Sequence, residues 1–321
     1  MTGVRVGIIG TGFGAKVVAP TFTAAGAEVV EVVSPRDESA VASLCGRADV
    51  DLISIHSPPF LHVQHVASAC QERRAVLCDK PFGVNVEDAE QMVAAARDAG
   101  VLNLLNFEFR HEPGRIRVKE LIDAGEIGTP EHVQWSVINA GSRNPLRPYG
   151  WLFDRSLGGG WVGAWGAHGV DTVRWLLDAE VTHATAQLRT TITHRPDRAG
   201  EMHSCTAEDG FTAALTLDTG ATVTFDTSFA AATNQANRTV VFGSEGTIEL
   251  VNDRVITLRR PDGTKEEVEL ARQTGDQHAG ALGPWLHSVV DAVERGEQIA
   301  TSFADGLAVR AVLDALLAEA R

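Results

Sequence analysis

The chain has 321 residues, of which 44% are hydrophobic, and its mean hydropathy of −0.03 is typical of a globular protein long enough for two domains with their own cores. Aspartate and glutamate number 42 against 28 lysines and arginines, so the net charge of −14 disfavours nucleic acid or a membrane surface as a partner and favours a small molecule. The four cysteines show no paired spacing and no apolar run reaches the roughly 18 residues of a membrane span, so we expect reduced thiols in a cytoplasmic protein.

The first predicted element is an apolar strand that ends in a glycine-rich turn. Residues Val4 to Ala15 read V-R-V-G-I-I-G-T-G-F-G-A, and helical character returns from Lys16 to Ala25. This order fits a dinucleotide-binding turn, because Gly10 permits the tight turn, Gly12 lets backbone approach a pyrophosphate, and Ala15 is small where the helix packs on the strand. The turn residues predicted at the cofactor are Gly10, Gly12, Phe13, Gly14 and Ala15. A glycine-rich turn without a ligand is the alternative.

The second strand, Glu28 to Val33, is followed by Ser34-Pro35-Arg36. In dinucleotide-binding sheets an acidic residue at this place binds the ribose 2′-hydroxyl of NAD, whereas a nearby arginine accommodates the 2′-phosphate of NADP. Because Ser34 takes the acidic position and Arg36 follows, NADP is favoured over NAD. Arg36 as a solvated loop charge is the alternative.

Strands and helices then alternate up to about residue 107, which predicts a doubly wound parallel sheet with helices on both faces. The expected elements are a helix at Glu38–Gly46, a strand at Asp51–His56, a helix at Leu61–Arg73, a strand at Ala75–Cys78, a helix at Val86–Ala99 and a strand at Val101–Phe107. Ligands of such sheets bind at the carboxyl ends of the strands, where Ser57 and Lys80 fall. The short segment between Arg36 and Asp49 indicates that one helix and strand of the sheet are missing.

Consecutive strands with glycine turns follow, and they predict a mostly antiparallel open sheet flanked by helices. A helix is expected at Ile116–Ala124, and strands are expected at His132–Asn139, Ala184–Ile192, Phe211–Leu217, Ala221–Phe229, Arg238–Phe242, Thr247–Val251 and Val255–Arg259. Two closing helices are expected at Trp285–Arg295 and Phe303–Ala320. The predicted domains are residues 1–110, for the dinucleotide, and 111–321, for substrate and oligomerisation, with the last helices able to pack back on the first domain.

Several motifs together resemble the Gfo/Idh/MocA family of NAD(P)-dependent oxidoreductases over nearly the whole chain. They are the turn G-T-G-F-G-A, Ser57-Pro58-Pro59-Phe60-Leu61-His62, Cys78-Asp79-Lys80-Pro81, Arg110 with Pro113, and Gly159-Gly160 through His168 to Asp171. The resemblance implies a Rossmann domain joined to an α+β domain, hydride transfer between nicotinamide and a secondary alcohol or carbonyl of a sugar, polyol or cyclitol, and a homodimer or homotetramer.

Asp79-Lys80-Pro81 resembles the family's Glu-Lys-Pro signature, whose lysine reaches nicotinamide and substrate. An ammonium group beside a reacting hydroxyl stabilises the developing alkoxide, so Lys80 is a predicted catalytic residue. A surface lysine at a strand end is the alternative. The resemblance also places at the cofactor Ser57, Pro58, His62, Asp79, Lys80 and Pro81, and His62 is equally interpretable as a structural cap.

His168 is predicted at the start of a helix that runs through Leu177, where its imidazole can take the hydroxyl proton, with Asp171 one helical turn later to orient it. Family members with the full signature carry an aspartate four residues before the histidine, and this chain has Ala164 there. The difference puts the usual Lys-Asp-His proton relay in question and leaves a helix-cap histidine as the alternative.

Arg110, Trp161, Trp165 and His168 are the predicted substrate-binding residues, although a packed domain interface explains the tryptophans equally well. No metal site is predicted, because His62 and His65 lack a third ligand nearby. Two other functions stay open: a cofactor-binding regulator without turnover, for which Ala164 argues, and a lyase or glycosidase in which hydride leaves and returns without net consumption of NAD.

Overall fold

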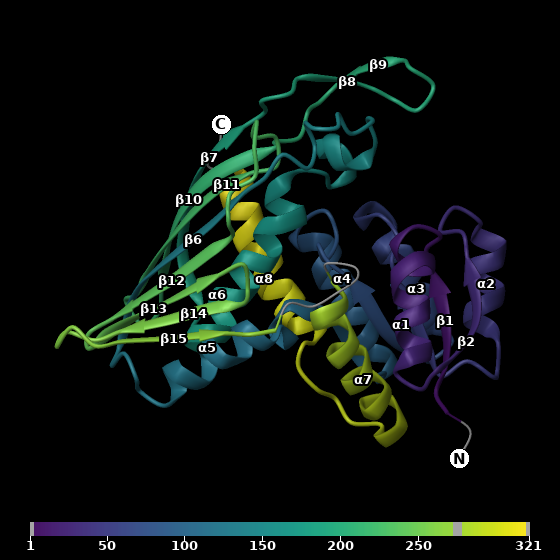
Figure 1. The fold of residues 1–321 in the computed structure, drawn as a ribbon. Helices are drawn as coiled ribbons and strands as arrows, with labels where there is room; N and C mark the ends of the chain where they lie inside the picture. Colours follow the sequence, from purple (N-terminus) through teal and green to yellow (C-terminus); the bar gives the residue numbers. More distant parts are fainter. Residues whose placement is uncertain (1–2, 272–277, 319–321) are drawn as a thin grey trace. The chain divides into compact units, whose positions relative to one another are not determined.

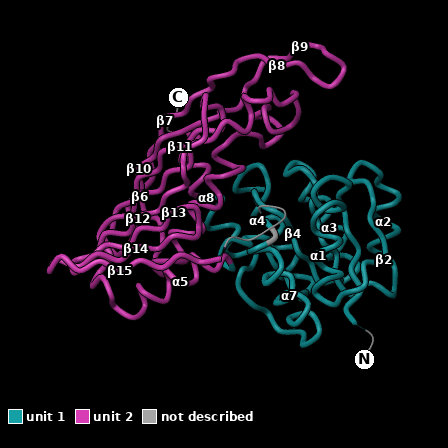
Figure 2. Tube along the Cα trace, viewed as in Figure 1, with its two compact units in different colours: residues 1–111, 273–311 teal, residues 112–272, 312–321 magenta. Residues whose placement is uncertain are grey.

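The computed structural model describes residues 3–271 and 278–318. The chain divides into two units, residues 1–111 with 273–311 and residues 112–272 with 312–321, which Figure 2 colours separately. The first unit therefore takes in a segment close to the carboxyl end of the sequence as well as the amino-terminal part. Each unit has its own sheet and is described by itself.

The first unit is built on a five-stranded sheet in the order β2-β1-β3-β4-β5, and every adjacent pair is parallel (Figure 1). The strands are β1 (Arg5–Ile9), β2 (Glu28–Val33), β3 (Leu52–Ile55), β4 (Ala75–Asp79) and β5 (Asn103–Asn106). The inner strands read as continuous apolar runs because helices cover both faces of a parallel sheet. The predicted doubly wound sheet is confirmed.

Helices connect these strands at nearly the predicted places. They are α1 (Ala19–Ala24), α2 (Glu38–Gly46), α3 (His62–Gln71) and α4 (Val86–Ala99). The Asp37 carboxylate caps α2 by accepting from the Ala40 N–H, and Asn85 caps α4 in the same way from Asp88. Gly100, in the left-handed region, ends α4.

A late segment of the chain completes the core of this unit. Helix α7 (Ala279–Arg295) buries Leu282, Trp285 and Val289 in one apolar cluster with Val6 and Phe22. Trp285 is fully buried, so the sheet depends on a helix that is encoded far downstream. The next helix, α8 (Phe303–Ala318), begins in the first unit and ends in the second.

Strand β2 is an edge of the first sheet. After β2 the chain passes through α2 directly to β3, which pairs with β1 on its other side. A dinucleotide-binding sheet of the common order has a further strand beyond β2. The predicted loss of one helix and strand is therefore confirmed, and the loop from Ser34 to Asp37 lies at an open edge.

The second unit contains an eight-stranded sheet in the order β15-β14-β13-β12-β6-β11-β10-β7, antiparallel except for the pair β6 and β11. Its strands are β6 (Pro130–Ile138), β7 (Val181–Arg189), β10 (Gly210–Leu217), β11 (Thr222–Ser228), β12 (Arg238–Gly243), β13 (Gly246–Val251), β14 (Val255–Arg259) and β15 (Lys265–Glu269). The predicted mostly antiparallel sheet is confirmed.

Two helices cover one face of this sheet, α5 (Pro113–Asp123) and α6 (Ala167–Leu177) (Figure 1). The α6 backbone comes close to the sheet at Gly169, where an added Cβ would lie 3.1 Å from the Trp135 ring. Side chains alternate along β6, because Val133 and Trp135 are buried while Gln134 points to the opposite, exposed face.

Three strands were not expected from the sequence: β8 (His194–Pro196), β9 (Met202–Ser204) and β15. β15 reads K-E-E-V-E and is exposed throughout, so it has no apolar alternation to detect. Helix α7 begins at Ala279 rather than Trp285, because burial of Leu282 outweighs the low helix propensity of Gly283 and Pro284. The predicted end of the last helix at Ala320 lies outside the described residues. No helix in residues 3–271 or 278–318 combines the length and the apolar character needed to cross a bilayer.

Candidate cofactor and catalytic site

The glycine-rich turn follows β1 at the carboxyl edge of the first sheet. Gly10 has φ of +151°, and an added Cβ would lie 2.7 Å from the His56 carbonyl oxygen, so only glycine fits there. Gly12 is exposed, with no atom within 4 Å of the place its Cβ would take. The turn is therefore tight on its inner side and open on its outer side, as backbone binding of a phosphate requires.

The close contact between helix and strand differs from the prediction. An added Cβ at Gly14 would lie 3.1 Å from both Ile8 and His56, whereas Ala15 is only half-buried. The chain makes a wide π-helical turn over Gly14–Val18, which brings Gly14 rather than Ala15 against the sheet. The third small position of the turn is thus Gly14.

The loop after β2 presents Ser34 and Arg36, both exposed, at the open edge of the sheet. The Ser34 hydroxyl oxygen accepts from the Arg36 N–H at 3.3 Å. Asp37, the first acidic residue of the loop, holds its carboxylate on the start of α2. One oxygen of the first carboxylate after β2 therefore serves as a helix cap.

Two buried histidines hold the Ser57-Pro58 loop that follows β3. His62 Nε2 donates to the Ser57 carbonyl oxygen at 2.8 Å, which supports the predicted structural role of this residue. His65 Nε2 donates to the Pro35 carbonyl oxygen at 3.2 Å, and its Nδ1 is 3.0 Å from the Ser57 hydroxyl. His65 thus joins the loops after β2 and β3, a role that its sequence position does not reveal.

Burial keeps both of these histidines neutral at physiological pH. Burial lowers the pKa of His62, against the opposing effect of its bond to the Ser57 carbonyl. Burial, with a smaller contribution from His62, lowers the pKa of His65 to about 4. A neutral His65 that donates through Nε2 accepts a hydrogen bond from the Ser57 hydroxyl at Nδ1. The two partners therefore fix the tautomer of the ring.

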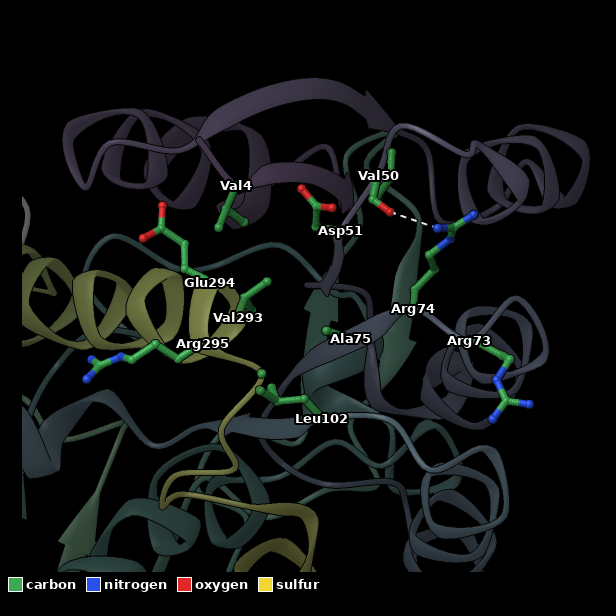
Figure 3. Close-up of a pocket in the computed structure, with 11 residues that line it drawn as sticks. Val4, Val50, Asp51, Arg73, Arg74, Ala75, Leu102, Val293, Glu294 and Arg295 are labelled. Atoms are coloured by element: carbon green, nitrogen blue, oxygen red, sulfur yellow. Dashed lines mark hydrogen bonds between the residues drawn. The ribbon is translucent and has the colours of Figure 1, made fainter. Parts of the chain in front are cut away.

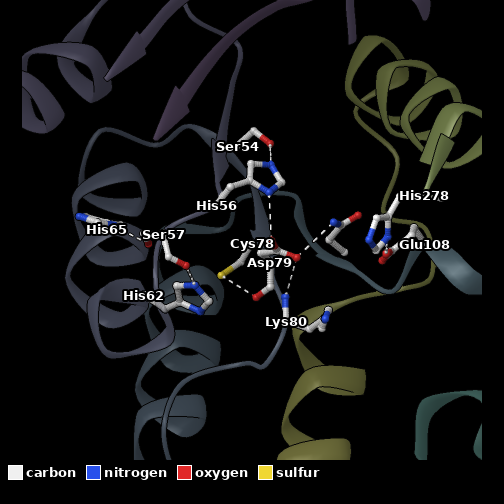
Figure 4. Close-up of polar contacts among 11 residues, drawn as sticks. Ser54, His56, Ser57, His62, His65, Cys78, Asp79, Lys80, Glu108 and His278 are labelled. Carbon is white, nitrogen blue, oxygen red and sulfur yellow. Dashed lines mark hydrogen bonds and ion pairs between the residues drawn. The ribbon is translucent and has the colours of Figure 1, made fainter. Parts of the chain in front are cut away.

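Asp79 closes β4 and is held by three donors, which Figure 4 shows together with Lys80. Its Oδ1 accepts from the Lys80 N–H at 3.0 Å and from the Asn106 side chain at 3.2 Å, and its Oδ2 lies 3.3 Å from His56 Nδ1. Burial raises the pKa of Asp79, but the hydrogen bond and charge of His56, together with the charge of Lys80 and the hydrogen bond from Asn106, outweigh it and lower the pKa to about 2. Asp79 is therefore ionised.

Lys80 follows β4 at the same carboxyl edge as the glycine-rich turn and is half-buried, and its peptide bond to Pro81 is cis. Arg110, in a short turn after β5, pairs its guanidinium with the Asp305 carboxylate at 3.1 Å. The parallel topology thus brings three predicted segments, the Gly10–Ala15 turn, Ser57-Pro58 and Asp79-Lys80-Pro81, to one edge of one sheet.

In the second unit, His168 and Asp171 are one turn apart in α6, and both are buried. The Trp165 ring meets the His168 imidazole edge-on, with 5.6 Å between centroids. The predicted helix through Leu177 is present as α6, but it continues directly from a π-helical turn over Val162–Gly166. His168 therefore lies within a continuous helix and not at its start, which argues against the alternative of a helix-cap histidine.

The two predicted substrate tryptophans differ in their surroundings. Trp161 is 6% exposed and makes parallel stacking contacts with Trp165 at 5.4 Å and with Phe229 at 4.2 Å. Its environment is therefore that of a packing residue and differs from the open ring face expected of a sugar-binding residue. Trp165 is half-buried and lies beside His168.

A cavity of about 730 Å³ lies at the opposite edge of the first sheet (Figure 3). It is lined by residues at or just before the amino ends of strands, among them Val4, Asp51, Ala75 and Leu102. The Arg74 guanidinium in this cavity already donates to the Val50 carbonyl oxygen at 3.0 Å. The cavity is thus separate from the predicted cofactor edge.

The β8–β9 hairpin brings together Asp197, Glu201 and His203, whose potential ligand atoms lie within 4.8 Å of one another. The Asp197 carboxylate there accepts from the Ala199 and Glu201 N–H groups and lies 3.2 Å from His203 Nε2. These bonds give Asp197 the role of a loop cap, and nothing else at the hairpin points to a cation.

Comparison with known proteins shows the family. Residues 39–107 match the oxidoreductase family with an NAD-binding Rossmann fold, and residues 116–249 match the Gfo/Idh/MocA C-terminal domain. Inositol 2-dehydrogenase 1 of Saccharopolyspora erythraea is 30% identical over 98% of this chain and 93% of its own length. The chain belongs to the Gfo/Idh/MocA family. It is accordingly an NAD(P)-dependent oxidoreductase.

Other Gfo/Idh/MocA relatives agree with this assignment. Inositol 2-dehydrogenase 3 of the same organism is 29% identical over 97% of this chain and 91% of its own length. The solved structure of levoglucosan dehydrogenase in complex with NADH and L-sorbose superimposes with a TM-score of 0.88 at 21% identity, over 100% of this chain and 97% of that chain. The latter likeness shows that the two chains share a fold.

Proposed function

We propose that this protein transfers a hydride between nicotinamide C4 and a carbon that carries a secondary hydroxyl or carbonyl group in a sugar, polyol or cyclitol. The observation that carries the proposal is Lys80, anchored beside an ionised Asp79 at the sheet edge that also bears the glycine-rich turn. The named substrates of the relatives, inositol and levoglucosan, are polyhydroxylated rings, and they support the substrate class.

The residues of the first unit fit a dinucleotide. The open backbone at Gly12 suits a pyrophosphate, and we propose that Ser34 and Arg36 face the adenosine ribose. Because Ser34 stands where an acidic residue would bind the 2′-hydroxyl and the Asp37 carboxylate caps α2, the Arg36 guanidinium favours a 2′-phosphate. We therefore propose NADP as the preferred cofactor. The bound nicotinamide supplies the acceptor or donor of the hydride.

Lys80 acts on the substrate oxygen in this proposal. In the oxidation direction the hydroxyl oxygen gains negative charge as its carbon loses hydride, and the Lys80 ammonium stabilises that charge. The same group polarises the carbonyl in the reduction direction. Its main-chain N–H is held by the Asp79 carboxylate, which limits rotation of the backbone from which the side chain extends.

His168 is the proposed acid–base group. It takes the hydroxyl proton during oxidation and returns it during reduction, while the C–H hydride passes to or from nicotinamide, so charge and protons balance. Asp171, buried one turn later in α6, is proposed to orient the imidazole. Because Ala164 stands four residues before His168, we propose that the proton reaches His168 without an intervening aspartate.

The assembly is proposed to be a homodimer or homotetramer, as the family resemblance implies. The resemblance places the interface between copies on the eight-stranded sheet. Exposed Gln134, Thr212 and Thr224 lie on the face of that sheet opposite its buried side chains.

Titration of the purified protein with NADH and NADPH, followed by fluorescence, tests the proposed function. A panel of inositols, sugars that include levoglucosan and L-sorbose, and their keto forms is then added. We expect tighter binding of NADPH and a substrate-dependent change in the reduced-nicotinamide signal. Binding without turnover on the panel would favour a redox-inactive regulator, for which Ala164 argues. Cleavage of a substrate without net cofactor change would favour a lyase or glycosidase, and no binding would overturn the proposal.

A further inference from the structure

His56 lies between the glycine-rich turn and the Asp79-Lys80 segment, and its side chain is inaccessible to solvent. On one side an added Cβ at Gly10 would come within 3.0 Å of the His56 Cβ, and one at Gly14 within 3.1 Å of it. The Phe13 ring meets the imidazole edge-on, with 5.9 Å between centroids. The turn that is proposed to bind the pyrophosphate therefore rests directly on His56.

On its other side His56 forms two polar contacts, which Figure 4 shows as a continuous line from Ser54 to Asp79. His56 Nε2 is 2.8 Å from the Ser54 hydroxyl, and Nδ1 is 3.3 Å from Asp79 Oδ2. An ionised carboxylate only accepts hydrogen bonds, so the proton of the second contact is on Nδ1. Ser54 then donates to Nε2 of a neutral ring or accepts from a charged one.

The Asp79 carboxylate that contacts His56 also binds the backbone of Lys80. Its second oxygen accepts from the Lys80 N–H at 3.0 Å and from the Asn106 amide at 3.2 Å. His56 from the end of β3, Asn106 from β5 and the Lys80 backbone therefore converge on a single carboxylate. Removing His56 would leave one oxygen of a largely buried carboxylate without its donor, which is costly and allows the group to rotate.

We propose that His56 is a positioning residue for hydride transfer. It fixes the Lys80 backbone through Asp79, and its packing against Gly10 and Gly14 fixes the position of that backbone relative to the glycine-rich turn. This inference rests on the proposed function. Residue 79 is aspartate where the resembling signature has glutamate, and the carboxylate of this shorter side chain meets His56 Nδ1 at 3.3 Å.

Two substitutions of His56 separate positioning from packing. His56→Ala removes the Nδ1 donor, and we expect kcat to fall about 10-fold to 100-fold while the substrate KM changes by less than about threefold. His56→Asn places an amide N–H near the Nδ1 position, and we expect it to restore most of kcat. His111→Asn is the matched control, because His111 is a half-buried histidine of the same unit that packs against Trp285.

A double-mutant cycle tests the match between the two side chains. Asp79→Glu is expected to lower kcat on its own, because the longer side chain meets the imidazole. In the Asp79→Glu background, His56→Ala is expected to cost less than it does in the wild-type protein, because the glutamate reaches the space that the ring leaves. Effects that add independently would contradict the match.

The pH profile of kcat gives a second readout. The ionisable groups that face Asp79 are His56, His62, Cys78 and Lys80. Without the hydrogen bond and charge of His56, burial raises the pKa of Asp79 from about 2, so the acid limb of kcat in His56→Ala is expected to move to higher pH. The limb in His56→Asn is expected to stay closer to that of the wild type.

Nitrogen-15 NMR of the histidine rings in the wild-type protein tests the contact without any turnover. We expect a proton on His56 Nδ1, with a resonance that changes in Asp79→Asn. A neutral ring protonated on Nε2 alone, or unchanged kcat and pH profile in His56→Ala, would overturn the inference. A wild-type protein without redox activity would instead overturn the proposed function, and the NMR result would still decide whether His56 holds Asp79.

Discussion

At the scale of single residues, the proposed chemistry depends on two side chains, Lys80 and His168. Lys80→Met or His168→Ala is expected to lower turnover about 10²-fold to 10⁴-fold, because each removes a group that stabilises charge or moves a proton at the reacting oxygen. Cofactor affinity is expected to stay nearly unchanged, since neither role involves the pyrophosphate. Steady-state rates and fluorescence titration measure the two quantities, and near-normal turnover in both variants would refute the assignment.

Arg36 is the residue on which the proposed cofactor preference depends. Arg36→Ala is expected to weaken NADPH binding about 10-fold to 100-fold and NADH binding much less, because only NADPH carries a 2′-phosphate to pair with the guanidinium. Arg73→Ala is a suitable control, since Arg73 is an exposed arginine that lines the cavity at the opposite edge of the sheet. Equal losses for the two cofactors in Arg36→Ala would argue against 2′-phosphate recognition.

At the scale of elements, the contact between α5 and the turn from β13 to β14 depends on a glycine. An added Cβ at Gly114 would lie 2.0 Å from the Asp253 carbonyl oxygen, which is backbone in a left-handed turn and cannot move cheaply. Gly114→Ala is therefore expected to destabilise the second unit by about 1–3 kcal/mol in denaturant unfolding. Gly283→Ala in α7, where nothing lies within 4 Å, is expected to be neutral or slightly stabilising.

At the scale of the whole molecule, the two units are expected to respond to pH in opposite directions. In the first unit, burial lowers the pKa of His65 and of His111 to about 4, so the unfolded chain binds more protons between pH 4 and 6.5 and stability falls as the pH falls through this range. In the second unit, burial and Asp253 raise the pKa of Glu112 to about 7, against the effect of Arg115. There the folded chain binds more protons, and stability falls as the pH rises from 4.5 to 7.

Hydrogen exchange of backbone amides in α3 and α5 across this pH range separates the two trends. Glu112→Gln is expected to make the stability of α5 less dependent on pH. His65→Asn is expected to do the same for α3, and to lower the stability of α3 by about 1–2 kcal/mol because a buried hydrogen bond is lost. Parallel trends in the two helices would contradict the assignment of these groups.

The sequence by itself determined the order and type of most elements, because most strands and helices of the first unit carry an apolar pattern of their own. The spacing of Gly10 and Gly12 after an apolar strand was enough to predict the turn, and the alternation of apolar strands with helical segments was enough to predict the parallel sheet. Polar strands such as β15 could not be found, because they show no alternation when both faces meet solvent.

The tertiary structure alone decided which polar groups meet. His56, His65 and Asp79 come from different parts of the chain, and only the parallel pairing of β3 with β4 brings His56 to Asp79, while α3 brings His65 to the loop after β2. The choice of Gly14 over Ala15 for the close contact likewise depended on the width of the first helical turn. Local sequence encodes periodicity and turn chemistry, whereas contacts between distant residues depend on strand order, which no local pattern specifies.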